Sequence, residues 1–226
     1  MIVVKRQETS GRRVALREAL VAAAERVIRE RGYQALRARE LALDVGCALG
    51  AIYNVFPDLD ALVLAVKARA LDFLDAEIAG RIMSARPEGA NPETALREAE
   101  RLLQELARLY LAFASENPRL WQAVFEHRSP NDVVPYSYME KLDRVLTHVE
   151  RPVAILVPAA SASERQALAR ALFSAVHGIV ALGLDGKLGP VSAELLEWQI
   201  SALLHAAAIG LAAGTTPAPD QAGARR

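Results

Sequence analysis

Hydrophobic residues recur at intervals of three and four along nearly the whole chain, and no segment alternates convincingly between polar and apolar positions. This spacing places apolar side chains on one face of an α-helix. The first such stripe consists of Leu16, Ala19, Leu20, Ala23, Ala24, Val27 and Ile28. Gly32 predicts the end of that helix, because glycine adopts a left-handed conformation without a Cβ penalty. The pattern predicts an all-α protein of about nine helices.

Two short helices are expected next, from about Arg37 to Val45 and from Leu49 to Val55, separated by Gly46. Pro57 and Asp58 mark a boundary, and Asp58 is a candidate cap for a long helix. That helix carries the apolar residues Leu62, Val66, Ala70, Phe73 and Leu74. A longer helix followed by two short helices that hinge at a glycine is the arrangement of a helix-turn-helix.

The remaining chain is punctuated by proline and glycine. Residues 86–92 predict a linker, an amphipathic helix spans Leu96 to Phe113, and Asn117-Pro118 starts another. A helix is expected from Tyr136 to Val149 and then a loop, because several prolines follow. Residues 153–157 have a strand-like composition, but a lone strand would have no partner.

The C-terminal region predicts two more helices and a tail. Ser161 and Glu164 match a capping box at the start of the first helix. A turn at 184–190 precedes the last helix, which continues through Leu211, and the polar tail from Thr215 is expected to be disordered. We therefore expect residues 1–57 to form a helix-turn-helix domain, 58–214 a helical ligand-binding and dimerisation domain, and 215–226 a disordered tail.

Composition is that of a globular protein: of the 226 residues, 52% are hydrophobic and 24% charged, and the formal net charge is zero. Any basic surface must therefore be local. The stretch from Trp198 to Pro219 contains no Asp, Glu, Lys or Arg, but it is rich in alanine and includes Gln199 and His205. We expect it at a subunit interface, not in a membrane. A cytoplasmic protein is expected, with no internal disulfide because Cys47 is the single cysteine.

Three segments of the N-terminal region resemble the TetR family of transcriptional regulators. They are Ala24 to Tyr33, Glu40 to Ala42, and Val45 to Pro57, and the resemblance covers about Arg13 to Val66. A looser resemblance links Phe173 to Leu182 with the penultimate helix of a TetR subgroup that carries a Trp-x-x-x-His-Gly signature. Phe173 stands where that subgroup has tryptophan.

The resemblance implies that the second short helix reads bases in the major groove of double-stranded DNA. The implied DNA-contacting positions are Ala48, Leu49, Gly50, Ala51, Tyr53 and Asn54. Tyr53 would reach a phosphate. Asn54 is the side chain able to bond adenine in bidentate fashion, whereas Leu49 and Ala51 offer apolar contact to a thymine methyl.

Phosphate contacts are expected from nearby cations, namely Arg12, Arg13, Arg37 and Arg39. The alternative is that these arginines form a solvated surface. Two features oppose DNA binding: the family usually has a hydroxyl residue at Ala48 and a lysine at Leu59, and Asp58 and Asp60 add negative charge.

Aromatic side chains of the second domain could line an apolar ligand pocket, with hydroxyl groups orienting the ligand. The candidate lining is Leu103, Leu106, Tyr110, Phe113, Trp121, Phe125, Tyr136, Met139 and His177. Several of them could instead simply pack the core, notably Phe113 and Trp121. For His177, a satisfied core or interface histidine is the default interpretation, and the family resemblance adds a role facing the ligand as the alternative.

No cofactor, metal site or catalytic residue is expected. The four histidines are scattered without metal-ligand spacing, and no nucleophile–histidine–acid arrangement can be argued. No basic residue adjoins Cys47 in the sequence, so core packing is favoured over a redox role.

These observations together predict a transcriptional repressor that is released by a small apolar or aromatic effector. A homodimer is expected through the last two helices, about Ser163 to Leu184 and Ser192 to Ala213, because their small residues allow close approach. Two-fold symmetry would imply a palindromic operator. The alternative is a helical small-molecule-binding or enzymatic protein whose helix-turn-helix no longer binds DNA.

Overall fold

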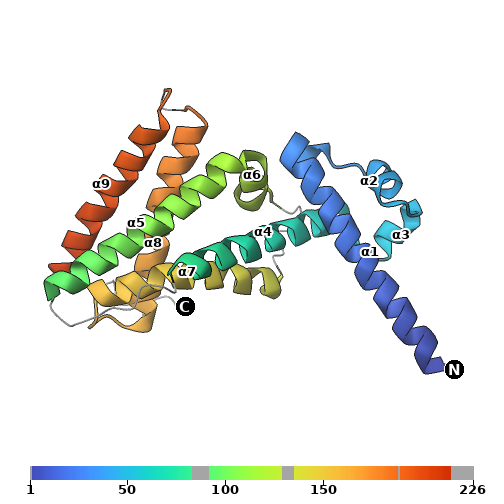
Figure 1. Cartoon of the computed structure of the whole chain (residues 1–226), viewed down its shortest axis with the longest axis horizontal. Coiled ribbons are helices and arrows are strands. Elements are labelled where there is room, and N and C mark those ends of the chain that lie inside the picture. Colours follow the sequence, from blue (N-terminus) through green and yellow to red (C-terminus); the bar gives the residue numbers. More distant parts are fainter. Residues whose placement is uncertain (1, 83–91, 129–134, 188, 215–226) are drawn as a thin grey trace, which may run out of the picture. The chain divides into compact units, whose positions relative to one another are not determined.

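The computed structural model describes residues 2–82, 92–128, 135–187 and 189–214. In these residues the chain forms nine α-helices and one short 3₁₀ helix, with no β-strand (Figure 1). The expected all-α fold is confirmed. The helices are α1 Ile2–Arg31, η1 Tyr33–Ala35, α2 Ala38–Val45, α3 Leu49–Tyr53, α4 Leu59–Ile82, α5 Pro92–Glu116, α6 Pro118–Glu126, α7 Tyr136–Leu156, α8 Ala162–Leu184 and α9 Ala193–Ala212.

The chain divides into two compact units. One contains Met1–Leu74 and Phe113–Leu142, and the other contains Asp75–Ala112 and Asp143–Arg226. The first unit therefore holds more than the predicted helix-turn-helix domain, because α6 packs against α1. Arg29 of α1 donates to Asn117 at the start of α6, and Arg119 of α6 donates to the carbonyl of Glu30. The functional boundary after Pro57 stays a prediction.

The core of the first unit is formed by the apolar stripe of α1 and by buried residues of α2 and α3. Leu20, Ala24 and Ile28 are fully buried, as is Ile52, and Leu41 is 1% exposed. Two solvent-exposed ion pairs also join α2 to α1, Arg26 with Asp44 at 2.6 Å and Arg31 with Glu40 at 3.0 Å.

The predicted ends of these helices rest on local backbone requirements. Gly32 and Gly46 have φ angles of 82° and 72°, a left-handed range that favours glycine. Asp58 accepts a hydrogen bond of 2.7 Å from the Ala61 N–H and so satisfies one of the free donors in the first turn of α4.

The predicted end of the helix at Val149 is wrong, because α7 continues through Pro152 to Leu156. Val153 is fully buried and packs with Val157 and Ala169 in a cluster that Val149 also contacts. Burial of these side chains outweighs the hydrogen bond that proline removes from the helix. The strand-like run from residue 153 is consequently helical.

The capping box at the start of α8 is confirmed. The Glu164 N–H donates to Ser161 Oγ at 3.2 Å, and the Ser161 N–H donates to Glu164 Oε2 at 2.7 Å. Hydrogen bonds from Ser161, first from its backbone N–H and then from its side chain, lower the pKa of the Glu164 carboxyl. The predicted linker at 86–92 falls almost entirely outside the described residues, and so does the tail from Thr215.

Helices α8 and α9 are long and apolar enough to cross a membrane by length and composition alone. In their most apolar windows only 17% and 28% of the residues are buried inside the subunit. A subunit interface has the same composition and the same lack of cover within one subunit.

Candidate DNA-binding surface and ligand cavity

One face of helix α3 packs against the rest of the first unit, and its other face is exposed to solvent. Ile52 is fully buried and Phe56, just beyond the helix, is 4% exposed, and Arg17 of α1 lies 5.2 Å over the Phe56 ring. The exposed positions are Ala48, Leu49, Gly50, Tyr53 and Asn54, and Ala51 is half-buried. The structure thus places the predicted base-reading residues on one short, anchored helix and its ends.

The predicted phosphate-binding arginines differ in their surroundings. Arg12, Arg13 and Arg39 are exposed. Arg37 is also exposed, but its Nη1 donates to the carbonyls of Gln34 and Leu36, both at 2.8 Å. Arg37 therefore stabilises the backbone that enters α2, whereas Arg39 makes no hydrogen bond or ion pair with the part of the chain that the structure describes.

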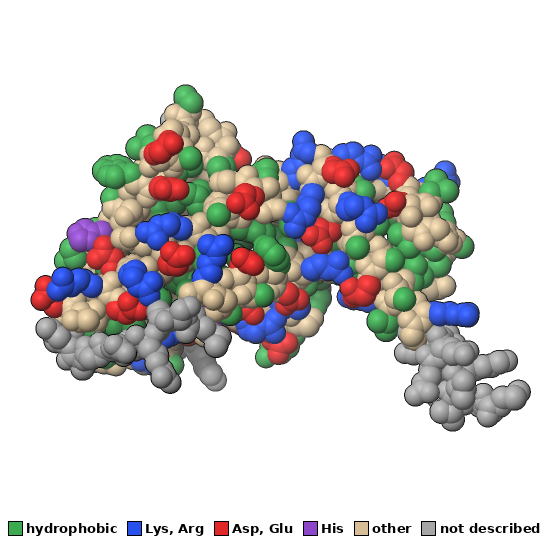
Figure 2. Space-filling view, in the orientation of Figure 1, with side chains coloured by type: hydrophobic (Ala, Val, Ile, Leu, Met, Phe, Trp, Pro, Cys, Tyr) green, Lys and Arg blue, Asp and Glu red, His purple; other side chains and the backbone are tan. Residues whose placement is uncertain are grey.

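Leu43 is an exposed apolar residue on α2 that sequence reasoning missed. Its side chain is 84% exposed, more than any other large hydrophobic residue described. It lies four residues after Arg39, so the two share a helix face. Glu40 and Asp44, which pair with α1, lie on a different side of α2. Figure 2 shows hydrophobic side chains over α2 and α3, together with both basic and acidic side chains.

A polar junction connects the helix-turn-helix region with α4 and α6 inside the first unit. His127, at the end of α6, bonds Asp60 through Nε2 at 2.9 Å, and its ring meets the Tyr33 ring edge-on at 5.1 Å. Lys67 donates to the His127 carbonyl at 3.0 Å. Burial lowers the pKa of Lys67. No sequence spacing connects these residues, so pattern analysis did not find them.

Lys67 also lies 5.2 Å from the centre of the Tyr138 ring, on α7. Burial raises the pKa of the Tyr138 hydroxyl to about 12. The junction is therefore a desolvated site, in which a lysine is held by a carbonyl and an aromatic face.

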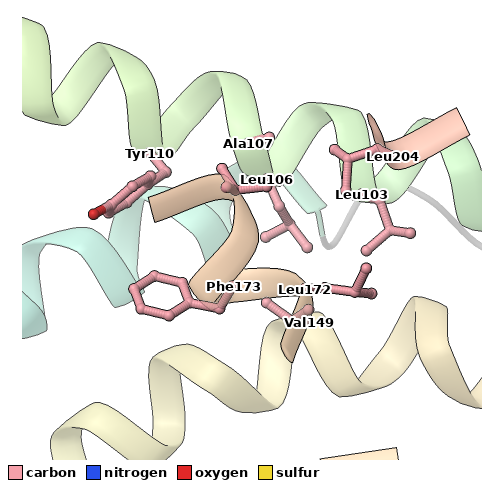
Figure 3. A pocket seen from close by; sticks show the side chains of 9 residues that line it. Leu103, Leu106, Ala107, Tyr110, Val149, Leu172, Phe173 and Leu204 are labelled. Carbon is pink, nitrogen blue, oxygen red and sulfur yellow. The ribbon is translucent and has the colours of Figure 1, made fainter. Parts of the chain in front are cut away.

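An apolar cavity of about 50 Å³ lies in the second unit (Figure 3). Its lining comes from α5, α7, α8 and α9 and consists of Leu103, Leu106, Ala107, Tyr110, Val149, Leu172, Phe173, Val176 and Leu204. The Tyr110 and Phe173 rings lie on one side of it, away from Leu103 and Leu172. The space is small compared with drug-sized pockets of roughly 300–1,000 Å³.

A tyrosine–histidine pair stands beside this cavity. Tyr110 Oη and His177 Nδ1 are 2.6 Å apart, and the Tyr110 ring meets the Phe173 ring edge-on at 5.4 Å between centroids. Phe173 stacks on the His177 ring at 5.8 Å. Phe173, at the position of the subgroup's tryptophan, thus contacts both partners of the pair.

The cavity includes only some of the predicted pocket residues. Leu103, Leu106 and Tyr110 line it, and His177 reaches it through Tyr110. Five other candidates belong to the first unit and do not line it: Phe113, Trp121, Phe125, Tyr136 and Met139. Phe113 and Trp121 are buried, and Tyr136 is 79% exposed. Val149, Leu172 and Leu204 were missed, because leucine and valine carry no signal that distinguishes a cavity from a core.

A second, larger hollow of about 300 Å³ lies between α5 and α9. Polar and charged side chains line much of it, among them Gln104, Arg108, Glu194 and Glu197, together with Trp198. Elsewhere, no group of three His, Cys, Asp or Glu side chains comes close enough to hold a metal ion among the described residues.

The N-terminal helices define a helix-turn-helix protein. Two family profiles extend this assignment: the profile of bacterial regulatory proteins of the tetR family matches residues 20–66, and that of the tetracyclin repressor-like C-terminal domain matches residues 103–203. Together the matches cover more than half of the chain. The chain belongs to the TetR family and is a DNA-binding transcriptional regulator.

Solved structures share the fold at low sequence identity. A TetR-family regulator from Streptomyces coelicolor is 20% identical, with a TM-score of 0.58 over 88% of this chain and 82% of its own. RolR in complex with resorcinol is 17% identical, with a TM-score of 0.57 over 92% and 98%. The fatty acid degradation regulator FadR from Bacillus halodurans is 16% identical, with a TM-score of 0.56 over 88% and 99%. No curated protein matches the chain.

Proposed function

We propose that this regulator represses transcription as a homodimer on a palindromic operator and is released when a small apolar or aromatic effector occupies the α5–α9 cavity. The observation that carries the proposal is the apolar lining of this cavity, with one tyrosine–histidine pair beside it. An apolar space with a single orienting polar group suits a ligand that is mostly hydrocarbon.

The size of the cavity limits the effector. A volume of about 50 Å³ is smaller than a single aromatic ring needs, so the helices must separate slightly to admit one ring and much further to admit a long acyl chain. RolR, a protein of the same fold, binds resorcinol, a small ring with two hydroxyl groups. We therefore favour a phenol-sized effector, with a polar group that bonds Tyr110 or His177.

The proposed dimer uses the poorly covered faces of α8 and α9. Leu182, Leu195, Trp198 and Ile209 are 40%, 43%, 66% and 46% exposed. Small residues lie among them, all exposed or half-buried: Ala171, Ala175, Gly178, Ala202, Ala206 and Gly210. Pairing with a second subunit would bury this surface, and the small side chains would let the helices approach closely. A cytoplasmic, non-enzymatic protein follows from this proposal.

Selection of bound sequences from random duplex DNA tests the first half of the proposal. We expect an enriched palindrome whose half-sites are about one helical turn apart. Adding phenol-sized ligands should release that DNA for wild type. Tyr110→Phe should shift the effective ligand concentration without changing DNA affinity in the absence of ligand. Failure to enrich any sequence would support the alternative that the helix-turn-helix no longer binds DNA.

A further inference from the structure

The exposed surface of α2 and α3 carries several apolar side chains. Its exposed side chains include two leucines, Leu43 at 84% and Leu49 at 38%, together with alanine at position 48 and half-buried alanine at position 51. Helix α3 contains no lysine or arginine. Such a surface can gain free energy from burying methyl groups but has few donors for base edges.

The charged residues around this surface add few free hydrogen-bond donors that could contact base edges. Asp44 pairs with Arg26, and Glu40 pairs with Arg31. The Nη1 group of Arg37 is bonded to two backbone carbonyls. Arg39 remains as a cation on the same face of α2 as Leu43, and Tyr53 and Asn54 remain as polar groups at the end of α3. Tyr53 and Asn54 together supply few direct hydrogen bonds to bases.

The major groove presents one apolar group for such a surface. Thymine carries a C5-methyl group there, whereas guanine and adenine present hydrogen-bonding atoms. Leucine and alanine side chains pack against that methyl group and cannot replace the hydrogen bonds that a guanine edge would lose. An asparagine at the end of the helix complements this selection, because it bonds adenine, the partner of thymine.

We infer that this regulator reads its operator chiefly through C5-methyl groups, with Leu43 of α2 as a specificity-determining residue beside Leu49 and Ala51. The inference rests on the proposed DNA binding and adds the class of base that is read. Operator half-sites should be rich in thymine. A 5-methylcytosine should be accepted where an unmethylated cytosine is not, because it restores the methyl group at the same place in the groove.

The test uses the full-length dimer and a duplex obtained by selection. Each thymine of a half-site is replaced in turn by deoxyuridine, which removes only the C5-methyl group. At a contacted position we expect affinity to fall about fourfold, the equivalent of one buried methyl group. Replacing a contacted thymine by cytosine should weaken binding further, and 5-methylcytosine should recover part of the loss.

Variants of the protein test which residues cause the deoxyuridine penalty. Leu43→Ala and Leu49→Ala should each make the deoxyuridine penalty smaller at one position, while Asn54→Ala should leave the penalty and lose the preference for adenine. Phe73→Ala, which truncates an exposed apolar residue of α4, is the matched control and should keep every penalty.

The outcomes are distinguishable. If the selected duplex binds and every deoxyuridine duplex binds equally well, methyl reading is wrong and the proposed DNA binding stands. If a penalty exists but Leu43→Ala leaves all penalties unchanged, Leu43 is not a specificity determinant. If no duplex binds, the proposed function itself fails.

Discussion

Lys67 and Tyr138 are residues whose chemistry depends on their place in the fold. Both belong to the first unit, and desolvation moves the pKa of the lysine down and that of the tyrosine up, to about 12. Burial has this effect because it disfavours the charged form of either group. Neither shift follows from neighbours in the sequence, since the groups that bury these residues come from α4, α6 and α7.

The Lys67 shift predicts a pH dependence of stability. Because the folded pKa lies below 10.5, the unfolded chain holds more protons between the two values, and the stability of the wild type rises with pH in that window. Lys67→Met should remove this rise. The free energy of unfolding in urea, measured at pH 7 and pH 10, checks it. Lys187→Met, at an exposed lysine, is the matched control. Parallel pH profiles for wild type and Lys67→Met would contradict the prediction.

Arg39 and Arg37 should separate in their effects on DNA binding. Arg39→Ala should lower the slope of log affinity against log salt by about 0.9 per subunit, because one phosphate contact is lost in each. Arg37→Ala removes bonds to two carbonyls of its own subunit, so it should lower thermal stability and change the slope less. The measurement is DNA affinity between about 50 and 200 mM salt, a range over which such slopes can be compared. Equal slopes for Arg39→Ala and wild type would show that phosphates are neutralised elsewhere.

At the scale of helices, the sequence predicted most of what the structure contains. Gly32, Gly46, Asp58 and the Ser161 capping box follow from conformational or hydrogen-bonding needs that are local. The end of α7 was missed, because proline is a local signal whose cost can be outweighed by distant packing. Val153 is buried against α8, and no local pattern reports that contact.

Pro152 should therefore cost stability that alanine would recover. Alanine restores the missing backbone N–H within α7 and relieves the ring's clash with the preceding turn. Pro152→Ala should raise the free energy of unfolding by about 1–3 kcal/mol. Val153→Ala should have the opposite effect and lower the free energy of unfolding by a similar amount, because the substitution leaves a cavity in a closed cluster. Urea denaturation monitored by circular dichroism gives both values. A loss of stability in Pro152→Ala would mean that the proline sets the direction of the chain into α8.

At the scale of the whole molecule, the sequence indicated which helices exist but not which side chains meet. The aromatic residues expected in one pocket belong to two units, and the cavity takes Tyr110 together with aliphatic residues of α7, α8 and α9. Helical spacing shows which residues share a face. It does not show which faces meet, because that depends on helix packing across long separations in sequence.

The homodimer is the last prediction and the one on which palindromic DNA recognition depends. Ala206 is exposed within one subunit, so a charge there should leave the subunit folded. In the proposed dimer the same position lies between helices, and a buried unpaired carboxylate there is strongly unfavourable. Ala206→Glu should therefore be monomeric by sedimentation velocity at micromolar concentration, where the wild type is dimeric. The DNA affinity of this variant should also fall, because each half-site is then bound by a separate monomer.

Thr94→Glu is the matched control for this charge. Thr94 is exposed in the first turn of α5, where a carboxylate is favoured by the helix dipole, and it lies outside α8 and α9. It should remain dimeric and bind the operator as tightly as wild type. A monomeric wild type, or a fully dimeric Ala206→Glu, would place the subunit interface elsewhere on the molecule. In that event the apolar faces of α8 and α9 would need another partner.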